Sequence, residues 1–198
     1  MIGQINRQSI FGEELYKLSK KIDIKTIVEI GTWNGAGSTK CIIDGIIDSN
    51  HDKTFISLES SQTKYFEAQN NLKGYEKYVK LLWGRIIDVH DLTWLKAVTL
   101  GPEQQQWLWE DIENYKYCPL ILNEIPEKID LLLLDGGEFS TIPEFKKLYK
   151  RYTYLALDDI NSLKTKEIYK QLLKKTDHTL IKEDSERNGF AIFKKENT

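Results

Sequence analysis

This sequence of 198 residues is poor in cysteine, and it contains no long apolar run. Its two cysteines, Cys41 and Cys118, lie far apart and form no C-x-x-C pair, which argues against a disulfide framework and favours free thiols in a reducing compartment. No apolar stretch approaches the roughly 18 residues that a membrane-spanning helix needs. No apolar block follows Arg7, so we expect no signal peptide, no membrane partner and a cytoplasmic location.

The sequence also lacks a charge excess of either sign. It has 28 basic and 30 acidic side chains, for a formal net charge of −2. Such a balance gives no electrostatic reason to expect nucleic acid or an anionic membrane as the main partner. Hydrophobic residues make up 40% and charged residues 29%, as in ordinary globular proteins. The length predicts a single domain over residues 1–198 with a substantial core.

The most informative stretch is a glycine-rich turn between a predicted strand and a predicted helix. A β-branched segment at 26–30 runs into Gly31, Gly35 and Gly37, and Ser38 follows where a helix can begin. Glycine adopts positive φ and leaves no Cβ in the way, so such a backbone can approach a ligand closely. The free N–H groups at the start of the helix then favour a nucleotide-like ligand.

Two common glycine-loop motifs do not fit this turn. The dinucleotide pattern G-x-G-x-x-G, started at Gly35, places Lys40 where its third glycine should be. The phosphate-loop pattern needs a glycine before its lysine, and Lys40 follows a threonine. The remaining pattern is Glu29-x-Gly31-x-x-x-Gly35-x-Gly37.

Alternating apolar segments predict an α/β fold with a doubly wound, mostly parallel sheet of about seven strands, the last antiparallel, and helices on both faces. We expect strands at 26–30, 54–59, 78–83, 129–135, 152–159, 178–182 and 189–194. We expect helices near 8–21, 37–48, 62–73, 142–151 and 162–175. The final two strands are expected to form a hairpin around residues 184–188.

Residues 87–126 exceed what this pattern requires. Glu59 and Asp135 are 76 residues apart, whereas a compact passage between such strands takes about 50. The surplus holds Trp94, Trp107 and Trp109, and it predicts helices near 91–98 and 103–116. An aromatic insertion suits a lid, a substrate wall or a dimer contact, and a satellite core against the sheet edge is the alternative.

Acidic residues end several of the predicted strands. Glu59 stands 22 residues after Gly37, where an acid at a strand end can accept hydrogen bonds from ribose hydroxyls. Asp135, Asp158 and Asp159 end two central strands, and parallel strands bring their carboxyl ends to one rim. These three carboxylates could bind Mg²⁺. Alternatively, Asp135 contacts only a cofactor or water, and an aspartate of the pair caps the next helix.

The sequence resembles the class I S-adenosylmethionine-dependent methyltransferases, and especially small O-methyltransferases. The resemblance rests on residues 28–32, on Asp135-Gly136, on Asp158-Asp159 and on a closing strand at 189–194. It implies a Rossmann-like methyltransferase domain, S-adenosylmethionine as cofactor, and a cation at Asp135, Asp158 and Asp159. The cofactor-binding positions that we predict are Glu29, Gly31, Thr32, Trp33, Asn34, Gly35, Gly37, Ser38, Glu59, Ser60, Gly84, Arg85 and Asp135.

The sequence departs from this family after Asp135. Many relatives carry a histidine or lysine there, whereas this chain reads Gly136-Gly137-Glu138. Glu138 is therefore a candidate proton acceptor beside Asp135, and His90 could reach the rim from the insertion, although a lone histidine is more often structural. We expect O-methylation of a small hydroxylated acceptor, with a homodimer possible. A nicotinamide-dependent oxidoreductase and a non-catalytic module of the same fold are the alternatives.

Overall fold

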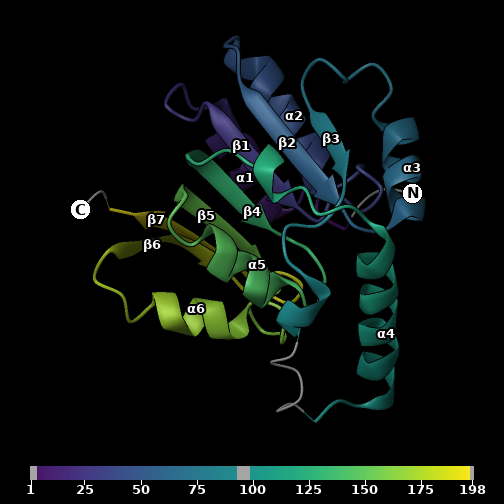
Figure 1. The fold of residues 1–198 in the computed structure, drawn as a ribbon. Helices are drawn as coiled ribbons and strands as arrows, with labels where there is room; N and C mark the ends of the chain where they lie inside the picture. The colour runs from purple at the N-terminus through teal and green to yellow at the C-terminus, as the bar shows by residue number, and fades with distance from the viewer. Residues whose placement is uncertain (1–3, 93–98, 197–198) are drawn as a thin grey trace.

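A computed structural model describes residues 4–92 and 99–196. Seven strands form one sheet in the order β3-β2-β1-β4-β5-β7-β6, with β7 antiparallel to both β5 and β6 and the other pairs parallel (Figure 1). In chain order the elements are α1 (Ile10–Lys20), β1 (Thr26–Ile30), α2 (Ser38–Ser49), β2 (Thr54–Glu59), α3 (Gln62–Asn71), β3 (Lys80–Trp83), α4 (Pro102–Tyr117), the 3₁₀ turn η2 (Leu122–Glu124), β4 (Ile129–Leu134), α5 (Thr141–Leu148), β5 (Tyr152–Asp158), α6 (Lys166–Leu172), β6 (His178–Asp184) and β7 (Phe190–Lys195).

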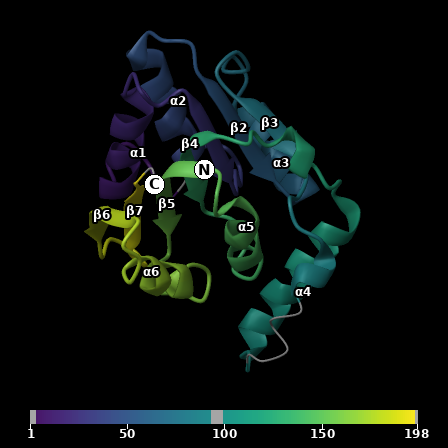
Figure 2. The same cartoon turned by 60° about the vertical axis from the view of Figure 1, so that its left-hand side comes forward.

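The two faces of the sheet form separate halves of the core because side chains alternate along each strand. Ile27 and Leu133 point to one face, where α1 and α2 pack. Val28 and Leu132 point to the other, where Phe145 of α5 lies in the same apolar cluster. Helices therefore cover both faces of the sheet (Figures 1 and 2). The central strand β4 reads as a continuous apolar run because both its faces are buried.

The predicted fold is confirmed, including the mixed sheet and its antiparallel end. The largest shift of an element boundary concerns α6, which the pattern predicts from 162 and which begins at Lys166. Residues 159–165 form a turn instead of a first helical turn. Asp159 has a φ of 57°, and the Thr165 hydroxyl donates to the Asp158 carbonyl oxygen at 2.7 Å. This turn contributes residues to the candidate site.

The insertion contains one long described helix, α4, which extends past the edge of the sheet (Figure 2). Pro102 opens it at the position where a missing N–H costs nothing. Trp107 and Trp109 are exposed on this helix, whereas Tyr115 is buried against the core. Trp94 and most of the helix expected near 91–98 lie outside the described residues. None of the helices within the described residues has the length and apolar character to cross a bilayer.

Candidate active site

The glycine turn after β1 lies against the end of β4. Gly31 has a φ of +98°, and a Cβ there would stand 2.1 Å from the carbonyl oxygen of Asp135. The N–H groups of Gly31 and Thr32 both donate to the Leu58 carbonyl oxygen, at 2.9 and 3.0 Å. Only glycine fits this position, because any side chain would push β1 and β4 apart. The turn is thereby held between the ends of three adjacent strands.

Glu29 anchors the same turn from below. Its carboxylate is fully buried and accepts hydrogen bonds from the hydroxyls of Ser38 (2.6 Å), Thr39 (2.7 Å) and Ser57 (2.5 Å). Burial raises the pKa of Glu29, and the three hydroxyl donors oppose that rise. The side chain therefore fixes the start of α2 relative to β1 and β2.

Glu59, at the end of β2, borders a cavity of about 310 Å³. The backbone N–H groups of Trp33 and Ser61 donate to its two carboxylate oxygens, at 2.7 and 2.8 Å. Burial raises the pKa of Glu59 to about 7, although these backbone donors act in the opposite direction. These two hydrogen bonds hold the Glu59 carboxylate at the cavity wall, where it can accept further hydrogen bonds.

The inserted helix α4 supplies one wall of this first cavity. Asp111, Asn114 and Tyr115 line it, together with Glu144 of α5 and Gly84 after β3. Arg85 also lines it, and its guanidinium donates to the carbonyl oxygens of Cys118 (3.2 Å) and Ile87 (2.7 Å). Arg85 therefore ties the insertion to the sheet edge.

Burial raises the pKa values of two acids in this cavity wall, Asp111 and Glu144. The Tyr115 hydroxyl donates to Glu144 Oε1 at 2.5 Å, and burial raises the pKa of Glu144 to about 7. Burial likewise raises the pKa of Asp111 to about 6. These acids lie close behind the turn after β4, since a Cβ on Gly137 would stand 2.7 Å from Asp111 Oδ2. The cavity wall can therefore offer carboxyl groups that bind or release a proton near neutral pH.

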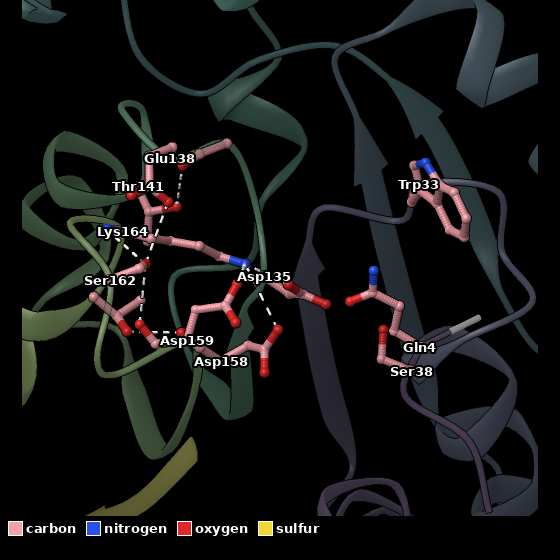
Figure 3. Close-up of polar contacts among 12 residues, drawn as sticks. Gln4, Trp33, Ser38, Asp135, Glu138, Thr141, Asp158, Asp159, Ser162 and Lys164 are labelled. Atoms are coloured by element: carbon pink, nitrogen blue, oxygen red, sulfur yellow. Dashed lines mark hydrogen bonds and ion pairs between the residues drawn. The ribbon is translucent and has the colours of Figure 1, made fainter. Parts of the chain in front are cut away.

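Asp135, Asp158 and Asp159 come together at the ends of β4 and β5, and Lys164 reaches between them (Figure 3). The ammonium nitrogen lies 2.5 Å from Asp135 Oδ1, 3.1 Å from Asp159 Oδ2 and 3.7 Å from Asp158 Oδ2. Burial acts to lower the pKa of Lys164, but the three carboxylates outweigh it and raise that pKa. Burial and the neighbouring acids raise the pKa of Asp158 to about 8, against the effect of Lys164.

A second cavity, of about 270 Å³, lies in front of these acids. Arg187, in the turn between β6 and β7, donates to Asp158 Oδ2 at 3.3 Å and to Gln4 Oε1 at 2.9 Å. Gln4 and Ser38 face the acids from the opposite side (Figure 3). The first and second cavities share three residues, which are Gly31, Trp33 and Asp135.

Most of the predicted cofactor positions border one of the two cavities. Gly31, Trp33, Glu59, Ser60, Gly84, Arg85 and Asp135 line the first. Gly31, Thr32, Trp33, Gly37, Ser38 and Asp135 line the second. Glu29, Asn34 and Gly35 line neither, because Glu29 is buried beneath the turn and Gly35 packs against Leu72, the residue that follows α3. These three positions support the turn from behind.

Neither predicted partner of Asp135 in proton transfer lines a cavity. Glu138 accepts hydrogen bonds from the Ser162 hydroxyl (3.2 Å) and the Leu163 N–H (3.1 Å), so it holds the turn before α6. His90 is exposed on the insertion, and its backbone N–H donates to the Asp88 carboxylate at 3.3 Å. Neither residue therefore borders the cavities that Asp135 borders.

The expected divalent cation does not fit this arrangement as it stands. The three aspartates offer oxygens within 4.8 Å of one another, as a hard cation would need. Lys164 Nζ, however, already lies within 3.7 Å of all three carboxylates. A cation bonded to these oxygens at about 2.1 Å would meet the buried ammonium charge at close range.

Sequence reasoning missed Lys164 and Arg187. Lys164 fell inside the helix expected near 162–175, and Arg187 fell inside the hairpin turn expected at 184–188. One signal was available, because several carboxylates on one rim require a positive charge among them. A lysine five residues after Asp159 was a candidate for that charge.

Comparisons with known proteins identify the kind of fold that carries this site. No family model matches the sequence, and a search of curated proteins finds no match. Among solved structures, an O-methyltransferase from Bacillus cereus, determined in complex with SAH, has a TM-score of 0.64 at 15% identity, over 98% of this chain and 84% of its own. This chain has a methyltransferase fold.

Two further structures agree with this assignment. The O-methyltransferase TomG from Streptomyces achromogenes, in complex with SAM, has a TM-score of 0.61 at 16% identity and covers 94% of this chain and 79% of its own. A methyltransferase from Geobacter sulfurreducens has a TM-score of 0.61 at 14% identity and covers 98% and 80%. At these identities the similarity establishes the methyltransferase fold alone.

Proposed function

We propose that this chain is an S-adenosylmethionine-dependent methyltransferase that methylates an oxygen of a small hydroxylated acceptor. The observation that carries the proposal is the pair of cavities that meet at Gly31, Trp33 and Asp135. One cavity ends at Glu59 and the other at the aspartates. A donor and an acceptor bound in the two would approach each other across the glycine turn.

The residues of the first cavity and of the turn fit the donor. Gly31 borders both cavities, and its backbone packs so closely on that of Asp135 that no side chain fits there. Glu59 would accept hydrogen bonds from ribose hydroxyls, since its carboxylate is already oriented by two backbone donors. Gly37 and Ser38, at the start of α2, line the second cavity, so the donor would extend from the first cavity past the glycine turn to reach them. When bound, S-adenosylmethionine would supply an activated methyl group.

Asp159 is the proton acceptor in this proposal. It lines the second cavity, and its Oδ1 accepts no hydrogen bond within the described residues, although the Arg187 guanidinium lies 3.8 Å away. Its backbone holds a positive φ of 57°, an uncommon conformation for a residue with a side chain. Asp159 would accept the hydroxyl proton of the acceptor, while Asp135 would orient that hydroxyl. Proximity and orientation would then supply most of the rate enhancement.

The proposed reaction does not use the expected cation, because Lys164 lies between the aspartates. A homodimer remains our prediction, supported by the exposure of Trp107 and Trp109 on α4. The role of α4 as a substrate wall is supported by Asp111, Asn114 and Tyr115, which line the first cavity.

Calorimetric titration with S-adenosylhomocysteine and with NADH tests the donor. We expect binding of the first and none of the second; the reverse result would point to an oxidoreductase. A methylation assay over sugars and phenols tests the transfer, with and without a chelator. Affinity for neither nucleotide, together with a silent panel, would indicate a non-catalytic module.

A further inference from the structure

Lys164 places its ammonium group among the three aspartates whose oxygens lie close enough together to hold a metal ion. Its side chain is 6% exposed, and its ammonium group contacts Asp135, Asp158 and Asp159 at once. In Figure 3 the side chain extends from the turn before α6 and ends between the carboxylates.

The turn that carries Lys164 is fixed at several points. Glu138 accepts hydrogen bonds from Ser162 and Leu163, and the Lys164 N–H donates to the Ser162 hydroxyl at 3.2 Å. Thr165 closes the turn by donating to the Asp158 carbonyl oxygen. These bonds fix the backbone from which the Lys164 side chain starts, and the three carboxylates hold its ammonium group.

Charge balance supports the same assignment. The cluster contains at most three negative charges, and Lys164 and Arg187 bring two positive charges to it. A divalent ion added to these groups would give the site an excess of positive charge in a buried place, which is costly. With two protein cations alone, the acids that face the second cavity can still accept a proton or bind a positively charged group.

We propose that Lys164 is a built-in replacement for the divalent cation, so that this chain works without a metal at the aspartates. The ammonium group holds Asp135 and Asp159 in place and offsets their repulsion, which are the structural tasks of a cation there. Lys164 is in this view a positioning residue, because it lines neither cavity. The catalytic part of this inference rests on the proposed function; its metal-binding part does not.

Calorimetric titration of the chelator-treated full chain with Mn²⁺ tests the inference directly. The wild-type chain should show no binding up to millimolar Mn²⁺. Lys164→Met keeps a side chain of similar length without its charge, and it should create a site with a Kd on the order of 10⁻⁴ M. Lys164→Arg, which retains the charge, should stay without metal. Lys170→Met changes a lysine of α6 outside the cluster and should behave as wild type.

Stoichiometric Mn²⁺ binding to the wild-type chain, lost in Asp135→Asn, would overturn the inference. Failure of a folded Lys164→Met chain to bind Mn²⁺ would also overturn it; Lys164→Gln replaces that variant if circular dichroism shows it unfolded. If the wild-type chain binds no metal and also methylates nothing, the proposed function fails while the replacement of the cation stands. If it methylates only in the presence of added metal, the inference fails while the proposed function stands.

Discussion

The ammonium nitrogen of Lys164 lies 2.5 Å from Oδ1 of Asp135, and these two residues come from different turns of the chain. Asp135 follows the central strand β4, whereas Lys164 precedes α6. The pair joins the ends of β4 and β5 below the second cavity. Its energy is therefore part of both the stability of the fold and the shape of the site.

The first prediction concerns this pair. Lys164→Met leaves buried carboxylates without their partner and should lower the free energy of unfolding by about 3–5 kcal/mol. Asp135→Asn should cost less, because Lys164 keeps Asp158 and Asp159. In urea denaturation the double variant should be less destabilised than the sum of both single variants, by about 0.5–3 kcal/mol. Strict additivity would show that the two side chains do not interact in solution.

The second prediction compares two glycines with positive φ. Gly31→Ala places a Cβ 2.1 Å from the Asp135 carbonyl oxygen, so we expect a chain that does not fold or that loses several kcal/mol. Gly74 has a φ of +87°, and a Cβ added there would have no atom within 4 Å. Gly74→Ala should lower the free energy of unfolding only by the backbone strain, about 1 kcal/mol. Equal thermal denaturation midpoints for the two variants would contradict the close approach of β1 and β4.

The third prediction concerns Glu59. In Glu59→Gln one carboxylate oxygen becomes an amide NH₂, which must face the N–H of Trp33 or of Ser61. We expect affinity for S-adenosylhomocysteine to fall by roughly 10- to 100-fold, the cost of a hydrogen bond to a charged group. Glu76→Gln, at an exposed glutamate away from both cavities, is the matched control. Calorimetry that gives the same Kd for both variants would refute the ribose role.

The fourth prediction is a pH dependence of stability that comes from Glu144. Burial raises its pKa from an ordinary 4.5 to about 7 in the folded chain, so the folded state binds this proton more tightly than the unfolded state. Its stabilising contribution is complete below about pH 4.5 and is lost as the pH rises through about 7, a change of roughly 3 kcal/mol.

Urea denaturation of the cofactor-free protein between about pH 5 and about pH 8 measures this contribution. The wild-type chain should lose stability over that range, and Glu144→Gln should lose less, because a glutamine has no proton to release. Some slope should remain, since Glu59, Asp111 and Asp158 also have raised pKa values. Glu127→Gln, at an exposed glutamate, serves as the control. Parallel pH profiles for the wild-type and Glu144→Gln chains would contradict the prediction.

Much of the fold could be predicted because its signals are local. The apolar run at 129–134 indicated a strand covered on both faces, and β4 is the fourth of seven strands in the sheet order. The glycine turn and the acid at Glu59 were recognisable from spacing alone. Strand ends of a parallel sheet meet on one rim by topology, so the order of strands and helices is enough to place Asp135, Asp158 and Asp159 together.

The rest depends on contacts that spacing does not encode. Glu29 looked like a ligand-binding acid, but three hydroxyls from α2 and β2 surround it. Glu138 follows the turn after β4, yet it bonds to the turn before α6. The direction of Lys164 depends on residues 159–165 not forming a helical turn. In this turn Asp159 has a positive φ, and Ser162 and Leu163 donate to the distant Glu138.

Asp135 borders both cavities, and this position should couple the affinities of two ligands that bind there. A ligand in one cavity alters the hydrogen bonds and the field of a carboxylate that also faces the other. Donor and acceptor should therefore bind with thermodynamic linkage, and the factor by which one changes the affinity of the other must be equal in either order of addition.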